Sequence, residues 1–321
     1  YEIGYVSGDL PTSVTAAVSA HWLANYGMAW FSLILIYELV RRYTQRSYPA
    51  LIAGCLAALS AFNIWYISIP STDYADMAIA CFSLWLLHHL LTGSQPPMSR
   101  VLLYGAIFGL MFLLKPLFLY LMFGVVLAVA VRRWRALITI LLMPGLVLLL
   151  YRFLIEAFGV PYELWEASHG WRSVNWLWNE FIFYTPTQML ASMSVWVGKT
   201  TSMITYFFGA LLVVGVFALS VHKIVHWQIT LTGWWLAFCS AVWVWIFQYT
   251  YPSHILGLMP FIYGGVGLGI ESAAEWLKAR IGDRPRLAGW IPRILWGLVV
   301  AHQIAQWLLW QNRQMLNYST F

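Results

Sequence analysis

The sequence predicts an all-α, polytopic transmembrane helical bundle, and three observations lead to that prediction. Hydrophobic residues make up 61% of the chain and charged residues only 9%, whereas about a quarter of the residues in a soluble domain are charged. The apolar residues occur in runs of roughly 18 to 24, and a helix needs about 20 residues to cross the hydrocarbon core. Runs such as 141–150 and 210–219 are continuously apolar, which favours helices, whose backbone groups are satisfied within each segment.

The apolar runs, which are separated by short segments with charged residues, predict about ten spans in a single transmembrane domain, residues 1–321. The spans are expected at 22–40, 50–68, 74–92, 101–114, 117–131, 136–156, 203–222, 229–248, 254–277 and 289–310. Lys115 and Pro116 predict a tight turn between the fourth and fifth spans, because proline disfavours helix at the preceding residue. One kinked helix over both spans is the alternative. Residues 1–21 form an outer-loop or juxtamembrane segment, and an amphipathic stretch is expected from Thr12 to Asn25.

The positions of the basic residues predict the orientation of the bundle. If the loops after spans one, three, five, seven and nine are cytoplasmic, thirteen of the eighteen Lys and Arg residues lie on that side, as the positive-inside rule requires. We therefore expect a multi-pass protein of the bacterial inner membrane whose active face is toward the periplasm. Because the chain opens at Tyr1 in a polar stretch, we also expect a preceding segment, either a spanning helix or a cleaved signal.

The segment 157–202 is the longest connection and is predicted to lie on the non-cytoplasmic side. It is rich in aromatic residues, including Trp165, Trp171 and Trp176, and amphipathic rings favour headgroup depth. We expect interfacial helices here, which would form a lid or platform over an outer cavity. An aromatic belt without a catalytic role is the alternative.

Acidic residues predicted to lie at the outer face are the first candidates for chemistry, because ionisable groups are costly to place near a membrane. Glu2 and Asp9 flank a glycine-containing turn in the opening segment. Asp73 and Asp76 lie at the mouth between the second and third spans, where they would offset a helix dipole. Their spacing of three also puts both carboxylates on one helix face, where they could bind a divalent cation or hold a general base.

Basic residues on the same predicted side form a second group of candidates. Lys115 lies at the Lys-Pro turn and His254 at the start of the ninth span, and cations beside carboxylates suit a phosphate or pyrophosphate headgroup. Arg172, in the outer segment 157–202, is added as a third substrate-binding candidate. Considered alone, each residue has a simpler alternative. Lys115 could extend its ammonium group toward the lipid headgroups, and His254 could be a packing residue.

Other features have simpler explanations. The net charge of +6 arises from short loops beside spans and forms no basic patch interleaved with aromatic residues, so no nucleic-acid partner is expected. Gly264, Gly265, Gly267 and Gly269 predict a small-residue face for helix packing. The absence of a convincing internal repeat counts against a transporter built from two inverted halves.

The order of several segments resembles the membrane module of the GT-C superfamily, the polyprenyl-phosphate-sugar-dependent glycosyltransferases that include protein mannosyltransferases and aminoarabinose transferases. The matching segments are Tyr37–Arg42, Asn63–Asp73, Gly105–Pro116 and Tyr251–Pro260. Each segment is degenerate, and the specificity comes from their order along the chain. The usual tandem Asp-Glu is not visible, because Tyr1 and Glu2 match only its second half, and a large soluble C-terminal domain is also lacking.

The resemblance implies an inverting transfer of a sugar from a polyprenyl-phosphate donor to a lipid, glycan or protein acceptor on the non-cytoplasmic face. The resemblance implies that Glu2 or Asp9, in the first outer loop, supplies the catalytic base, and that Asp73 occupies the position of a second acid. Lys115 and His254 would contact the donor phosphate. Membrane lipids, and potentially other membrane proteins, are the remaining expected partners. Two alternatives stay open: a non-catalytic GT-C-like subunit of a membrane complex, and a lipid or solute transporter.

Overall fold

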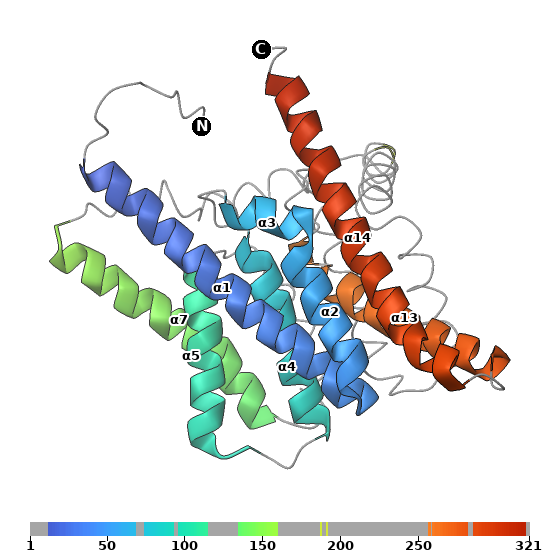
Figure 1. Cartoon of the computed structure of the whole chain (residues 1–321). Coiled ribbons are helices and arrows are strands. Elements are labelled where there is room, and N and C mark those ends of the chain that lie inside the picture. The colour runs from blue at the N-terminus through green and yellow to red at the C-terminus, as the bar shows by residue number, and fades with distance from the viewer. Residues whose placement is uncertain are drawn as a thin grey trace.

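The computed structural model describes residues 12–68, 74–92, 96–114, 134–159, 187, 191, 256–257, 259–281 and 285–318. Within these ranges every regular element is a helix, which confirms the all-α prediction for this part of the chain (Figure 1). The elements are α1 (Thr12–Thr44), α2 (Ser47–Leu59), α3 (Ala61–Ser68), α4 (Ala75–Thr92), α5 (Met98–Leu114), α7 (Trp134–Ala157), α13 (Met259–Arg280) and α14 (Pro285–Tyr318).

One segment of the described residues, Val18–Arg42 within α1, is both long and apolar enough to cross a membrane. Shorter apolar helices occur at Ser47–Leu59, Ala75–Leu90, Met98–Met111 and Gly145–Leu154. The total of ten spans therefore stays a prediction. Three of the expected spans, at 117–131, 203–222 and 229–248, lie outside the described residues.

The prediction of one continuous helix for the second span, 50–68, was wrong, because the chain divides into α2 and α3 at Ser60. The backbone of Ser60 is extended, with φ −62° and ψ 121°, so the helical hydrogen bonds cannot continue through it. The Asn63 side-chain amide donates to the Ala57 carbonyl at 2.7 Å and so satisfies one of the carbonyls that a helix end leaves open. A polar side chain inside an apolar run thus stabilises the break.

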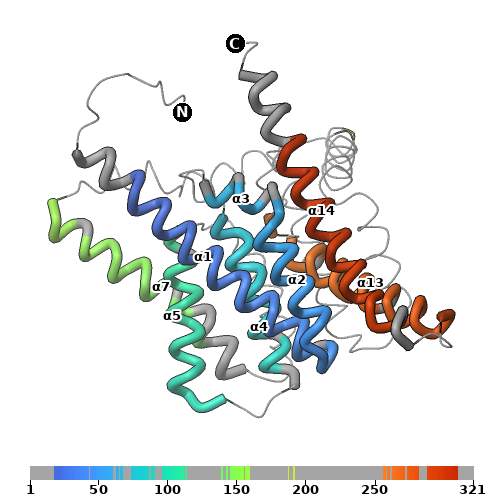
Figure 2. Tube along the Cα trace, viewed as in Figure 1, coloured from blue at the N-terminus to red at the C-terminus, as the bar shows by residue number. Residues whose placement is uncertain are grey.

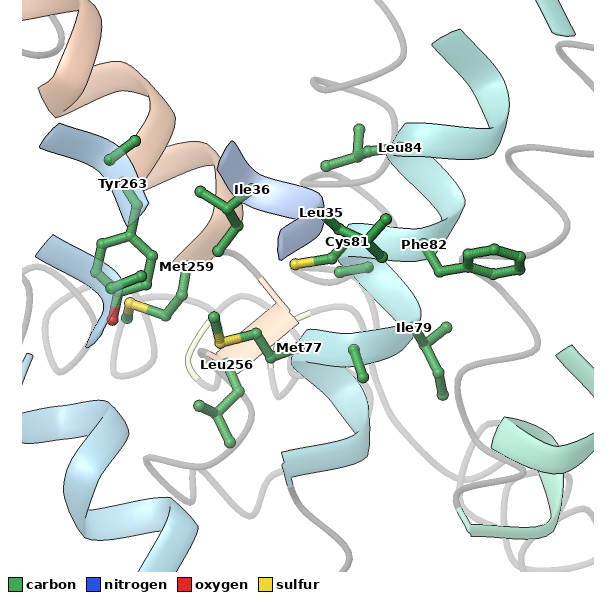
Figure 3. Close-up of a cluster of buried hydrophobic side chains, with 14 of the residues drawn as sticks. Leu35, Ile36, Met77, Ile79, Cys81, Phe82, Leu84, Leu256, Met259 and Tyr263 are labelled. Atoms are coloured by element: carbon green, nitrogen blue, oxygen red, sulfur yellow. The ribbon is translucent and has the colours of Figure 1, made fainter. Parts of the chain in front are cut away.

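The core lies where α1, α2, α4 and α13 pack together. Figure 3 shows side chains from α1, α4 and α13 gathered in this region, among them Ile36, Met77 and Met259. Cys81 is also buried there, as expected for a thiol that serves as a small packing residue. The core is therefore assembled from segments at opposite ends of the chain, with α13 adding residues that follow α4 by more than 160 positions.

Large apolar side chains cover the outward faces of α1, α7 and α14. On α1, Leu23, Trp30 and Ile34 lie on the unpacked side, and Leu23 is 76% exposed. Residues on α7 such as Leu142 and Phe153 are exposed in the same way. Apolar stripes of this size would be unfavourable in water and suit helices that face lipid.

Glycines allow two pairs of helices to approach closely. A Cβ on Gly267 of α13 would lie 2.6 Å from the carbonyl oxygen of Pro49 on α2. A Cβ on Gly105 or Gly109 of α5 would lie 2.6 Å from the side chain of Met143 or Val147 on α7. The small-residue face predicted for the ninth span therefore serves helix packing, at least at Gly267.

Several helix ends that carry basic residues lie together at one end of the bundle, which we call the basic end. α1 ends there and α2 begins there, beside the end of α13 and the start of α14 (Figure 2). The described basic residues of this end are Arg41, Arg42, Arg46, Arg100, Lys278, Arg280 and Arg293. The opposite end, where α2 meets α3 and where α4 and α13 begin, is called the polar end.

Candidate functional site

One of the seven candidate site residues, Asp76, lies within the described part of the chain. Glu2, Asp9, Asp73, Lys115, Arg172 and His254 lie outside the described residues. The convergence of Asp73, Lys115 and His254 on one pocket therefore remains a prediction.

Asp76 is in the first turn of α4 and is completely buried. Its neighbours Tyr74, Ala75 and Met77 are also fully buried. A carboxylate in the first turn is stabilised by the helix dipole, which is the structural role that the sequence offered for Asp76. Burial of the whole side chain goes beyond that role, because an acid that only offsets a dipole can do so in contact with water.

The metal-binding alternative for Asp76 gains no further ligand from the described residues. Among them, no group of three His, Cys, Asp or Glu side chains is arranged to hold a metal ion. Asp73, the second proposed ligand, lies outside the described residues. A divalent cation therefore stays a prediction, one that depends on the position of Asp73.

Asp76 belongs to a group of buried polar side chains at the polar end of the bundle. The group draws on α1, the α2–α3 junction, the start of α4, and α14, with Asn25, Ser60, Asn63, Asp76 and Gln303 each exposed by 2% or less. The side chains of Tyr74 and Tyr263 are completely buried in the same region. The Tyr263 side chain faces Ser60 and lies within electrostatic range of Tyr74.

Several buried oxygen atoms on α3, at the start of α4 and on α14 have no hydrogen-bond partner among the described residues. They include Oδ1 of Asn63, the hydroxyl of Tyr74 and Oε1 of Gln306. A buried polar atom without a partner costs about 1–3 kcal/mol.

The basic end is held by an ion-pair network. Arg46, in the turn between α1 and α2, binds Glu271 and Glu275 of α13. The hydrogen bonds to Glu275 and Glu271 raise the pKa of Arg46 above its usual value. The Tyr48 hydroxyl donates to the Pro292 carbonyl at 2.7 Å and so ties the start of α2 to α14. These contacts give Arg46, Glu271 and Glu275 a structural role, which is to hold the helix ends together.

A cluster of aromatic and basic side chains joins α1, α4 and α5 near the basic end. The guanidinium of Arg42 lies 5.9 Å from the ring centre of Trp85. The Trp85 ring stacks on His89 at 5.4 Å and contacts Tyr104 edge-on at 5.7 Å. His89, which the sequence places at the cytoplasmic end of the third span, therefore packs against aromatic rings.

Asn63, Tyr74, Tyr263, Gln303 and Gln306 were not among the candidates predicted from the sequence. Each is a polar side chain within or beside an apolar run, and polar groups inside membrane segments are functional candidates. That signal is present in the sequence. Only the tertiary structure shows that these side chains are buried or half-buried.

Comparison with known proteins finds a family match for part of the chain. Residues 20–158 match the family model described as dolichyl-phosphate-mannose-protein mannosyltransferase. No curated protein and no solved structure matches the chain. The matched segment begins within α1, ends just after α7 and contains Asp73, Asp76 and Lys115. The resemblance expected from the sequence is thus confirmed for residues 20–158, which match a family of the GT-C superfamily of membrane glycosyltransferases.

Proposed function

We propose that the chain is a membrane glycosyltransferase that moves a sugar from a polyprenyl-phosphate donor to a lipid, glycan or protein acceptor, with inversion at the anomeric carbon. The observation that carries this proposal is the family match over residues 20–158. Support comes from the buried polar group at the polar end, which includes Asp76. In the sequence, Asp73 comes before Asp76 at a spacing close to one helical turn.

In the proposed reaction a carboxylate of Glu2, Asp9 or Asp73 accepts the proton of the acceptor hydroxyl. The acceptor oxygen then forms a bond to the anomeric carbon while the bond from that carbon to the donor phosphate oxygen breaks. The polyprenyl phosphate leaves with the electron pair. Lys115, His254 and Arg172 would stabilise its negative charge, as cations do for developing anions in a water-poor site.

The orientation is part of the same proposal. The basic end would face the cytoplasm by the positive-inside rule, and the polar end would face the periplasm of a bacterial inner membrane. The side chains proposed for chemistry would then lie on the face where lipid-linked sugars are used. The proposal requires several membrane spans. Helices that cross the membrane in both directions are needed to bring these segments to one face.

The test is transfer of labelled sugar from a polyprenyl-phosphate-sugar in proteoliposomes. We expect the wild-type protein to transfer label and Asp73→Asn to lose at least about a hundredfold in rate, the usual scale for a general base. Glu156→Gln is the matched control, because Glu156 is an exposed acid paired with Arg152 on α7 and should leave the rate unchanged.

Two results would argue against this function. Full transfer by Asp73→Asn would remove Asp73 from the active site, and the test would move to Glu2 and Asp9. Absence of transfer by the folded wild-type protein with every donor tried, together with stable binding to another membrane protein, would favour the non-catalytic GT-C-like subunit.

A further inference from the structure

Three helices bring nitrogen-bearing side chains to one place near the basic end of the bundle. α1 supplies Arg42, α4 supplies His89 and α5 supplies Arg100. The end of α1, the end of α4 and the start of α5 lie at the same end in Figure 1. The His89 imidazole lies within electrostatic range of the guanidiniums of both Arg42 and Arg100. Basic groups from three separate segments therefore converge here.

Aromatic rings hold these side chains in place. The ring centre of Trp85 is 5.9 Å from the Arg42 guanidinium and 5.4 Å from the His89 ring centre. Tyr104 packs edge-on against both rings, with its centroid 5.7 Å from Trp85 and 6.1 Å from His89. Arg100 precedes Tyr104 by one helical turn on α5, so the two lie on the same side of that helix. The basic groups are thus positioned by packed rings on regular helices.

The described residues balance the positive charge of this cluster only in part. The Glu38 carboxylate accepts hydrogen bonds from Arg42 at 2.6 Å and from Arg41 at 3.0 Å, so two guanidiniums share one carboxylate. Within the described ranges, no ion pair joins Arg100 to an acid. Like charges that are close together repel one another, and an anion between them offsets that repulsion. The excess of positive charge therefore favours an anionic ligand.

The same basic groups can be reached from outside the protein. The Arg42 side chain is 38% exposed, Arg100 is exposed and His89 is partly exposed. The hydrogen bond from Arg42 to Glu38 uses Nε, and the two Nη atoms carry further N–H groups in the fork geometry that matches a phosphate. A phosphate group can approach these atoms without entering the buried core.

The level of the cluster in the bundle indicates a phosphate that belongs to a lipid. The apolar segment of α1, Val18–Arg42, ends at Arg42, which places this guanidinium at the headgroup region. Indole and phenol rings favour that depth. Leu103 and Leu110 continue the side of α5 that carries Arg100, and they are 57% and 60% exposed. An apolar stripe that begins beside a basic group suits an acyl chain below its headgroup, and a free phosphate ion would not need it.

We propose that Arg42, His89 and Arg100 bind the phosphate headgroup of an anionic phospholipid. An acyl chain of the same lipid would lie along Leu103 and Leu110. Basic sites between spanning helices on the cytoplasmic side bind anionic headgroups in this way. The site is at the opposite end of the bundle from the polar end, so it is separate from the proposed sugar transfer. It would hold the ends of α1, α4 and α5 to the surrounding leaflet.

The test measures the number and affinity of lipids bound to the purified full chain in detergent by native mass spectrometry. The lipids are phosphatidylglycerol, which is anionic, and phosphatidylcholine, which has a phosphate but no net charge. We expect Arg42→Gln and Arg100→Gln each to weaken binding of phosphatidylglycerol about fivefold, the scale for loss of one basic group beside an anionic lipid. Binding of phosphatidylcholine should change less than twofold.

Arg41→Gln is the matched control. Arg41 is next to Arg42 and binds the same carboxylate of Glu38, but it is Arg42 whose guanidinium lies over Trp85. Arg41→Gln should leave the affinity for phosphatidylglycerol within twofold of the wild type. Equal weakening by Arg41→Gln and Arg42→Gln would mean a general attraction of the basic end for anionic lipid, and it would overturn the site.

Two further measurements keep the proposal falsifiable. Arg100 is exposed, so Arg100→Gln tests the site even where Arg42→Gln loosens the end of α1, and unchanged binding by Arg100→Gln would overturn the proposal. Inorganic phosphate is added as a competitor at millimolar concentration. We expect it to leave phosphatidylglycerol bound, and complete displacement would show a site for a free anion and not for a lipid.

Discussion

Arg46 and Glu271, which are 225 positions apart in the sequence, form an ion pair with 3.2 Å between Nη1 and Oε1. The Arg46 side chain is 56% exposed, whereas that of Glu271 is only 11% exposed. The pair fixes the turn between α1 and α2 against α13. The nearly buried carboxylate therefore depends on a guanidinium supplied by a distant segment.

Arg46→Gln should lower the free energy of unfolding by about 1–2 kcal/mol, because it removes the guanidinium that forms an ion pair with the nearly buried carboxylate of Glu271. The double variant Arg46→Gln/Glu271→Gln should recover part of that loss. The measurement is thermal unfolding of the purified protein in detergent. Arg152→Gln is the control, since Arg152 and Glu156 are both largely exposed, and such pairs contribute little. An equal effect of Arg46→Gln and Arg152→Gln would show that burial of Glu271 is unimportant.

Gly267→Ala should destabilise the packing of α13 on α2. Its new Cβ would lie 2.6 Å from the Pro49 carbonyl oxygen and 3.1 Å from the Cβ of Ala53. Because the first of these is backbone, the helices must separate, and we expect a loss of about 1–3 kcal/mol. Gly264→Ala on the same helix is the matched control, because its Cβ would meet Val40 at an ordinary 3.4 Å. Thermal unfolding of the two variants checks the prediction, and equal midpoints would contradict the close contact.

Gly105→Ala and Gly109→Ala should separate α5 from α7 in the same way. The added Cβ atoms would lie 2.6 Å from Met143 Cγ and from Val147 Cγ2 respectively. Gly145→Ala on α7 meets nothing within 4 Å and should be neutral or stabilising by up to about 1 kcal/mol, since alanine is the better helix former. Resistance to unfolding by detergent or heat would be compared for the three variants. A Gly105→Ala protein as stable as Gly145→Ala would mean that α5 and α7 do not pack closely.

The orientation can be tested with single cysteines in a variant that lacks Cys55, Cys81 and Cys239. Gln45→Cys lies in the exposed turn at the basic end, and Phe158→Cys replaces a side chain that is 81% exposed just beyond the C-terminal end of α7. An impermeant maleimide should label position 158 from the periplasm in intact cells and position 45 only after the membrane is opened. The reverse pattern would invert the orientation, and labelling of both positions from outside would contradict their placement at opposite ends.

The sequence correctly indicated the helical class, the family of residues 20–158 and the approximate positions of α4, α5 and α7. These features depend on composition, on the length of apolar runs and on the order of local segments, all of which are visible in one dimension. The break at Ser60 was missed. It depends on a local hydrogen bond rather than on apolar length, as the contact between Asn63 and Ala57 shows.

The sequence by itself determined that the chain forms apolar helices. Its apolar runs are long and carry few charges, and in lipid the backbone N–H and C=O groups of such runs can form hydrogen bonds only with one another. The partners of those helices were decided only in three dimensions. The contact of Arg46 with Glu271 and the approach of Gly267 to Pro49 join segments more than 200 positions apart. Neither segment of such a pair predicts the contact by itself, because packing between distant helices depends on the shapes of both faces.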